Sequence, residues 1–562
     1  MNSLPVIHAL NRGLISRCAL AAFMLMLAAA CAQQPASNDH SAPETPGSPP
    51  LLDGLGTHHH AVTTSNEMAQ RYFDQGMRLL YGFNHDEAER AFREAARLDP
   101  NCAMTWWGVA YVLGPNYNLP IDPERNSRAV EAVRNAQALL AHASDSEKAY
   151  VGAIATRYSN DPKADRATLD QDYGRAMKAL HERYPDDVDA AVLYAEALMD
   201  LKPWQLWTTN GTPQPGTEEI LSVLESALKL DPQHPGANHY YIHATEASSD
   251  PARALPSAQR LRTLAPAAGH LVHMPAHVYI RTGDYRGAME ANQNAARADE
   301  TYFARTKADG VYSMMYYTHN FMFLSAAASM IGRSGDALES AAKAVSLVAP
   351  MAGHDPMAEY VLPWSLYAMT RNARWDDILA TPPPSDSTPF TLAMWRYARG
   401  MAYAAKSDTA AARAERRELA TATLKIPEDF LVNTNRGRDL LAIATAVLDA
   451  RLAAAGGNRN QAIALWQNAI DIQDRLVYDE PPAWYYPVRE SLGGEYLRAK
   501  RYREAERTFR RDLEINPNNP RSLFGLEQAL TAQSKTAEAS ETHARFEKEW
   551  AGADMKITID AL

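Results

Sequence analysis

The sequence predicts an all-α solenoid, in which antiparallel helix pairs stack on one another along most of the chain. The first observation behind this prediction is that apolar residues recur at helical spacing almost without interruption from Asn66 onward. The second is internal repetition, because a pattern of small and aromatic residues within 69–102 returns in later segments of the same length. A repeat of this length forms one helix pair, which buries its apolar face by packing against its neighbours.

The clearest repeat spans residues 69–102, and its pattern consists of Tyr72, Gly76, Leu79, Ala88, Phe92, Ala95 and Pro100. The small residues at 76 and 88 allow the two helices to touch closely, and the leucine and phenylalanine fill the layer between them. This pattern resembles the tetratricopeptide repeat (TPR), and its register recurs at 235–268, 269–302 and 486–519. The resemblance covers most of 66–550. It implies a TPR-type α-solenoid, a right-handed superhelix with a concave groove.

Composition and repeat quality divide the chain into consecutive segments. These are a lipoprotein signal peptide (1–30), a tether rich in Pro and Ser (31–65), N-terminal TPR-like repeats (66–200), a loop insertion (201–217), central repeats (218–350), C-terminal TPR-like repeats (351–550) and a tail (551–562). The tether contains few large apolar residues, which predicts a flexible spacer. The loop insertion is marked by its Trp and Pro residues.

The N-terminus predicts export. An apolar run at 19–30 is too short to span a membrane and ends in small residues before Cys31. This resembles a bacterial lipoprotein signal, with Cys31 as the lipidated residue; a plain secretory signal is the alternative. The resemblance implies a lipid anchor at the periplasmic face of the outer membrane. The segments HYYIHATE and HLVHMPAH further resemble a histidine-rich region of exported bacterial TPR lipoproteins.

Charge and motif content restrict the possible functions. The chain has 56 Lys and Arg against 67 Asp and Glu, and the two signs are interspersed. This acidic balance argues against nucleic-acid binding, which needs a basic face to replace condensed counterions. The sequence also lacks a phosphate-binding loop, a Gly-x-Ser-x-Gly turn, an HExxH motif and a dinucleotide fingerprint.

Two histidine pairs in the central repeats form the strongest candidate site. His239 and His243 lie 34 residues before His273 and His277, so the two pairs occupy equivalent positions in adjacent repeats. The spacing within each pair places both residues on one face of a helix. The TPR resemblance implies that this face lines the groove. Because neighbouring helices pack roughly 8–10 Å apart, imidazoles from both could bind one metal ion.

Further residues extend this candidate site. By spacing or register, His270 and Glu246 complete the ligand shell, and His319 is a possible additional ligand one helical layer further along. Imidazole and carboxylate ligands without thiolates favour Zn or Cu, with Fe as a further possibility. Glu246 is also the candidate proton acceptor for a metal-bound water. Pro275 leaves two alternatives open, a helix that begins late or a locally irregular helix.

Other side chains fall at groove positions of the repeat. Trp107, Tyr111, Arg489 and Glu490 are candidate contacts for a bound ligand. The cluster His58–His60, in the predicted tether, could supply extra metal ligands.

The sequence therefore leads to two hypotheses. The first is a membrane-tethered periplasmic TPR protein that binds a transition metal through its histidine cluster, which extends to a metal-dependent enzyme. The second is a metal-free TPR scaffold that binds a peptide or protein partner in the cell envelope, with histidine pairs copied by duplication of a repeat.

Overall fold

The computed structural model describes residues 48–562 except residues 162 and 356. Within that part the fold is all-α, and the strands found there, β1 (Leu431–Val432) and β2 (Asn435–Arg436), form a short antiparallel hairpin. None of the helices described is long and apolar enough to cross a bilayer. The predicted signal peptide and Cys31 lie outside the described residues, so export and lipidation stay predictions.

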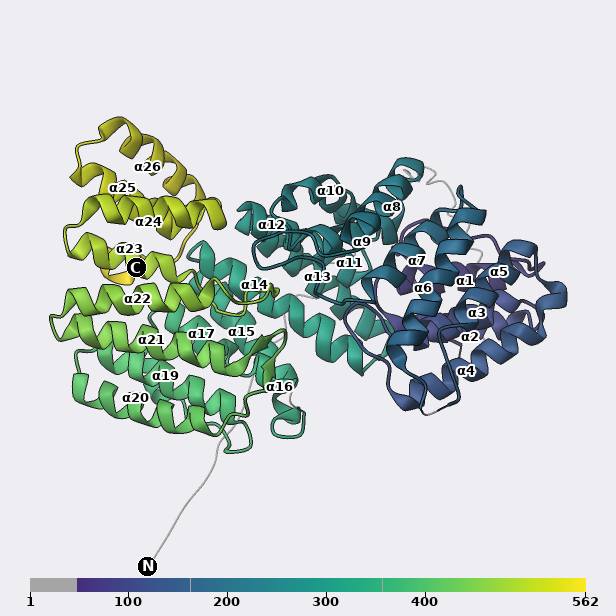
Figure 1. The fold of residues 1–562 in the computed structure, drawn as a ribbon, viewed down its shortest axis with the longest axis horizontal. Helices are drawn as coiled ribbons and strands as arrows, with labels where there is room; N and C mark the ends of the chain where they lie inside the picture. Colours follow the sequence, from purple (N-terminus) through teal and green to yellow (C-terminus); the bar gives the residue numbers. More distant parts are fainter. Residues whose placement is uncertain (1–47, 162, 356) are drawn as a thin grey trace, which may run out of the picture. The chain divides into compact units, whose positions relative to one another are not determined.

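Helices that follow one another along the chain pack as pairs in the N-terminal part (Figure 1). These pairs are α1 (Glu67–Leu80) with α2 (His85–Leu98), α3 (Ala103–Leu113) with α4 (Pro123–Ala138), α5 (Asp145–Ala155) with α6 (Arg166–Arg183), and α7 (Val188–Met199) with α8 (Thr217–Leu230). The predicted loop insertion lies between α7 and α8.

The central part continues this pairing with one broken helix. Its pairs are α9 (Pro235–Thr245) with α10 (Leu255–Leu264), the broken helix α11 (Gly269–His273) and α12 (Pro275–Thr282) with α13 (Tyr285–Thr306), and α14 (Thr318–Met330) with α15 (Ser334–Val348). A π-helical segment, Tyr312–Tyr317, leads directly into α14.

The C-terminal part completes the stack. It contains α16 (Ala358–Val361), then α17 (Trp364–Arg371) with α18 (Trp375–Ala380), α19 (Pro389–Ala405) with α20 (Thr409–Leu424), α21 (Gly437–Ala455) with α22 (Arg459–Gln473), α23 (Val488–Arg498) with α24 (Tyr502–Ile515), and α25 (Pro520–Ala532) with α26 (Thr536–Trp550). The last four pairs lie in successive layers in the green to yellow region of Figure 1. The predicted all-α, TPR-type solenoid is confirmed.

Glycines on either side of a phenylalanine explain why the repeat pattern recurs. A Cβ atom added to Gly76 or to Gly108 would lie 2.5 Å from the ring of Phe92, so the ring fills the space that both glycines leave. Near the other end of the stack, Gly493 and Gly525 enclose Phe509 in the same way, at 2.4 and 2.2 Å. The first and last clear repeats therefore use the same close helix contact.

This contact gives a stability prediction. Gly76→Ala forces a methyl group into the Phe92 ring, and overpacking of a core costs about 1–3 kcal/mol. We expect a lower midpoint of chemical unfolding followed by circular dichroism. Gly152→Ala is the matched control, because a Cβ there meets no atom of the described residues within 4 Å and alanine favours the helix. Equal midpoints for the two variants would contradict the packing explanation.

The described part of the predicted tether is docked on the helices. Leu55 is only 4% exposed, the amide of Ala267 donates to the carbonyl oxygen of Gly54 at 2.9 Å, and the amide of Leu52 donates to Gln75 Oε1 at 2.7 Å. The expectation of a flexible spacer is therefore wrong for residues 49–65. The leucines in this stretch bury apolar surface, which favours a packed conformation.

Two large apolar cores run through the stack. One extends from Leu55 to Ala337 and the other from Met322 to Leu492, and α14 contributes side chains to both. The candidate histidines lie on α9, α11, α12 and α14, and the last of these helices contributes to both cores.

Candidate metal centre

Helix α9 carries the first histidine pair. His234 caps this helix, since its Nδ1 accepts a hydrogen bond from the amide of Ala237, and Pro235 occupies the first helical position. His239 and His243 follow on the same helix, and both are buried. The local sequence thus starts the helix where the two imidazoles come to lie one turn apart.

The second pair lies on either side of a helix break. Backbone angles remain helical at Met274 (φ −50°, ψ −35°), although Pro275 lacks the N–H that would continue the hydrogen-bond ladder. Helix α11 therefore precedes the proline, and the locally irregular helix is the alternative that the structure shows. His273 comes before the break and His277 after it, and both are buried.

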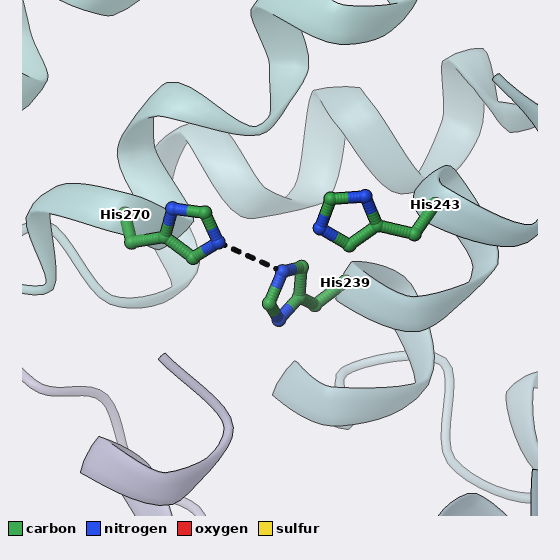
Figure 2. Close-up of side chains that lie close together, drawn as sticks. All are labelled: His239, His243 and His270. Carbon is green, nitrogen blue, oxygen red and sulfur yellow. Dashed lines mark hydrogen bonds between the residues drawn. The ribbon is translucent and has the colours of Figure 1, made fainter. Parts of the chain in front are cut away.

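The histidines form two groups of three. His239, His243 and His270 each offer a ring nitrogen, and these three atoms lie within 4.8 Å of one another. Figure 2 shows the three rings converging from α9 and α11, and the dashed line marks the 3.1 Å between Nε2 of His239 and Nε2 of His270. We call these residues the first triad.

The second triad consists of His273, His277 and His319, whose ligand atoms again lie within 4.8 Å of one another. Nε2 of His273 and Nε2 of His277 are only 2.7 Å apart. The two triads are adjacent, because the rings of His243 and His277 have centroids 5.4 Å apart. The structure thus brings together all six histidines that the sequence singled out on α9, α11, α12 and α14.

Oxygen atoms behind the rings fix the tautomers of two of these histidines. Nδ1 of His239 lies 2.7 Å from the carbonyl oxygen of Tyr81, so this nitrogen carries the proton. Nδ1 of His273 lies 2.7 Å from Asn292 Oδ1, and the Asn292 amide nitrogen donates to the carbonyl oxygen of Ala288. The amide orientation is thereby set, and Nδ1 of His273 is also protonated.

Glu246 fixes the tautomers of two more histidines, His243 and His277. Its Oε1 accepts from Nδ1 of His243 at 2.9 Å, and its Oε2 accepts from Nδ1 of His277. The carboxylate thus lies behind one histidine of each triad. Burial alone would raise the pKa of Glu246, but the neighbouring His277 and His243 lower it to about 2, so the group is ionised. His243, Glu246 and His277 also meet the distance criterion for a metal group.

These contacts leave the Nε2 lone pairs directed inward. His239, His243, His273 and His277 each hold a proton on Nδ1, so each presents an unprotonated Nε2. Nε2 of His243 has no hydrogen-bond partner among the described residues. Burial lowers the pKa of His239, His270 and His273 well below its ordinary value, and that of His319 to about 3. These four rings are therefore neutral, which is the form that binds metal.

A second cluster, around Asp189, differs in its tautomers. His60 Nδ1 lies 2.7 Å from Asp189 Oδ2, and Nε2 of His234 and of His58 lie 3.0 and 3.2 Å from Oδ1. Because Nδ1 of His234 accepts from the backbone of α9, its Nε2 carries the proton and donates to Asp189. That nitrogen has no lone pair for a metal.

The Asp189 cluster is better described as a set of contacts that holds residues 58–60 against the helices. Burial lowers the pKa of His60, but Asp189 outweighs this effect and raises it to about 9. Tyr81 also donates its hydroxyl to Asp189. His58 and His60 thus hold the docked segment in place through Asp189 and do not add ligands to the two triads.

The predicted groove contacts lie elsewhere. Trp107 and Tyr111 are buried in the apolar core, and the Tyr111 hydroxyl donates to Glu196 at 2.7 Å. Glu490 is buried and accepts two hydrogen bonds from the Arg371 guanidinium, at 2.5 and 2.9 Å. Arg489 pairs with Asp474 at 2.7 Å. The structure therefore places Trp107, Tyr111 and Glu490 in the protein interior and not on a groove surface.

Two residues behind the rings were not singled out from the sequence. Asn292 is a polar residue on the buried, alanine-rich face of α13, and that mismatch is a signal that could have identified it. Tyr81 acts through its backbone carbonyl, for which side-chain patterns give no signal.

Comparisons with known proteins bear on the fold alone. No protein-family model and no curated protein matches the chain. Among solved structures, it is similar to the human IFIT1 dimer with m7Gppp-AAAA, at 13% identity over 87% of this chain and 91% of that chain (TM-score 0.33). It is also similar to the APC/C hetero-tetramer Cut9–Hcn1 (12% identity, 83% and 77% covered, TM-score 0.31) and to yeast Tom70 (10%, 84% and 90%, TM-score 0.28). Such distant similarities carry no argument about the centre.

Proposed function

We propose that this protein binds two transition-metal ions, one in each histidine triad. The observation that carries the proposal is the contact between His273 and His277, whose Nε2 atoms lie 2.7 Å apart while both Nδ1 atoms hold protons. Two lone pairs that face each other at this distance repel unless a proton or a metal ion lies between or beside them, and burial lowers the pKa of both rings, which disfavours the proton. Two nitrogen ligands of one ion, each at about 2.0–2.1 Å, lie roughly 3 Å apart.

The donor set supports zinc or copper, with iron as a further possibility. All six proposed ligands are imidazoles, which suit these metals better than magnesium or calcium. Glu246 supports the ligands from behind, in the way that carboxylates orient histidines in zinc sites. An ion held by three imidazoles keeps a position for water or a substrate, as in catalytic zinc sites. The centre is therefore suited to metal-dependent catalysis.

Elemental analysis tests the proposal. The mature protein, produced without a histidine tag and passed over a chelating resin, is expected to retain two zinc or copper ions per chain. The variant His142→Ala is the control, since this histidine is exposed and distant in sequence from both triads. Protein that neither retains nor takes up a transition metal at these histidines would contradict the proposal. It would favour the metal-free scaffold.

A further inference from the structure

A cavity of about 240 Å³ adjoins the two triads. Its wall includes His243 and His270 of the first triad and His277 and His319 of the second. An ion in either triad would therefore be next to this space. Most of the remaining wall is apolar, which is typical of a small-molecule site.

Methionines dominate the apolar wall. They are Met314, Met315, Met322, Met351 and Met357. Met322 is 1% exposed and lies deep in the protein, whereas Met314 and Met357 are 40% and 49% exposed. Met314 and Met357 are thus exposed apolar residues that line the same cavity, and exposed apolar side chains that cluster mark binding sites. The methionines therefore continue from the surface to the interior of the cavity.

Aromatic rings complete the wall. Trp204, Tyr316 and Tyr360 all line the cavity. Methionine sulfur makes favourable contacts with aromatic rings, and its flexible side chain adapts to a bound ring. A dry apolar cavity of about 150 Å³ is large enough for benzene, so this cavity has room for a substituted ring.

Several polar atoms of the cavity wall lack a hydrogen-bond partner among the described residues, and one of them belongs to Glu480. Glu480 lines the cavity and is buried, and its Oε2 has no hydrogen-bond partner within the described structure. Burial raises the pKa of Glu480 well above its ordinary value, and the nearby Glu246 adds to this shift. A buried polar atom without a partner is costly, so a ligand that supplies a hydrogen bond here gains affinity.

We propose that the cavity binds a small aromatic molecule with one hydroxyl or carbonyl group, with its ring against the methionines and its polar group on Glu480. This inference rests on the proposed function in one respect, because such a molecule would be the substrate of the two-ion centre. The cavity itself consists of side chains that are present with or without metal.

The probe for the test is 4-ethylphenol, with ethylbenzene as the analogue that lacks the hydroxyl group. Isothermal titration calorimetry on the full mature chain is expected to show saturable binding of 4-ethylphenol and weaker binding of ethylbenzene, which lacks the hydrogen bond. Met351→Trp fills the half-buried part of the cavity and should weaken binding of both probes at least tenfold. Glu480→Leu should weaken 4-ethylphenol about fivefold or more and leave ethylbenzene unaffected, since only the phenol loses a hydrogen bond.

Controls separate this inference from the proposed function. Leu424→Trp, at a position that is 80% exposed on α20, should bind like the unchanged protein. Metal content is measured on every variant, and Met351→Trp should retain both ions. If the protein takes up no metal but still binds the probe in a way that depends on Met351, the cavity is supported and the two-ion centre is contradicted. Metal-loaded protein that binds neither probe, or binds both equally in Met351→Trp, would overturn the inference; so would copper(I) binding at the methionines in place of probe binding.

Discussion

His277→Ala is expected to remove one metal ion per chain and leave the other in place. Without His277, the second triad retains His273 and His319, and two imidazoles hold an ion far more weakly than three. The first triad keeps His239, His243 and His270, and Glu246 still accepts from His243. His243→Ala should have the reciprocal effect. Elemental analysis after dialysis would give about one ion per chain for each variant.

The combination of both substitutions should remove both ions. His142→Ala serves as the control for loss of an exposed histidine and should keep the full metal content. Circular dichroism checks that each variant is folded before its metal is counted. If either single substitution released both ions while the protein stayed folded, the division into two independent triads would be wrong, and a single shared site would explain the cluster better.

The helical stack and the histidine pairs were predictable because both depend on spacing. A 34-residue period places His239 above His273 and His243 above His277, and the structure brings all four together. Spacing does not show which ring nitrogen faces inward. That choice depends on the carbonyl oxygen of Tyr81, which lies 158 residues before His239, and on Asn292 of α13. The sequence therefore predicted a single histidine cluster, and the structure divides it into two triads.

Long-range contacts explain most of the remaining differences. The docked segment depends on Asp189, which is 129 residues from His60, and no local pattern predicts that pairing. Glu490 lies at a groove position by register, but it pairs with Arg371, which is 119 residues away in sequence, and a buried carboxylate requires such a partner. Trp107 and Tyr111 also lie at groove positions, yet both are buried in the apolar core.

Glu246→Gln is expected to weaken binding at both triads, although it removes no proposed ligand. A carboxylate accepts one hydrogen bond on each oxygen, and Glu246 uses one for His243 and the other for His277. Glutamine has the same shape, but its amide nitrogen is a donor and cannot accept from a second Nδ1–H. One histidine must then change its tautomer or turn, and its Nε2 lone pair no longer faces the ion. Loss of such a supporting contact typically costs 10–100-fold in metal affinity.

Competition with a metal chelator of known affinity measures this loss for each ion. Glu218→Gln, an exposed position on α8, is the matched control and should bind metal like the unchanged protein. Because the carboxylate touches both triads, the two affinities should fall in the same variant, whereas His243→Ala and His277→Ala each affect one. Unchanged affinity for both ions in folded Glu246→Gln would show that Glu246 does not orient the ligands. Complete loss of one ion with the other unaffected would instead make Glu246 a direct ligand of that ion.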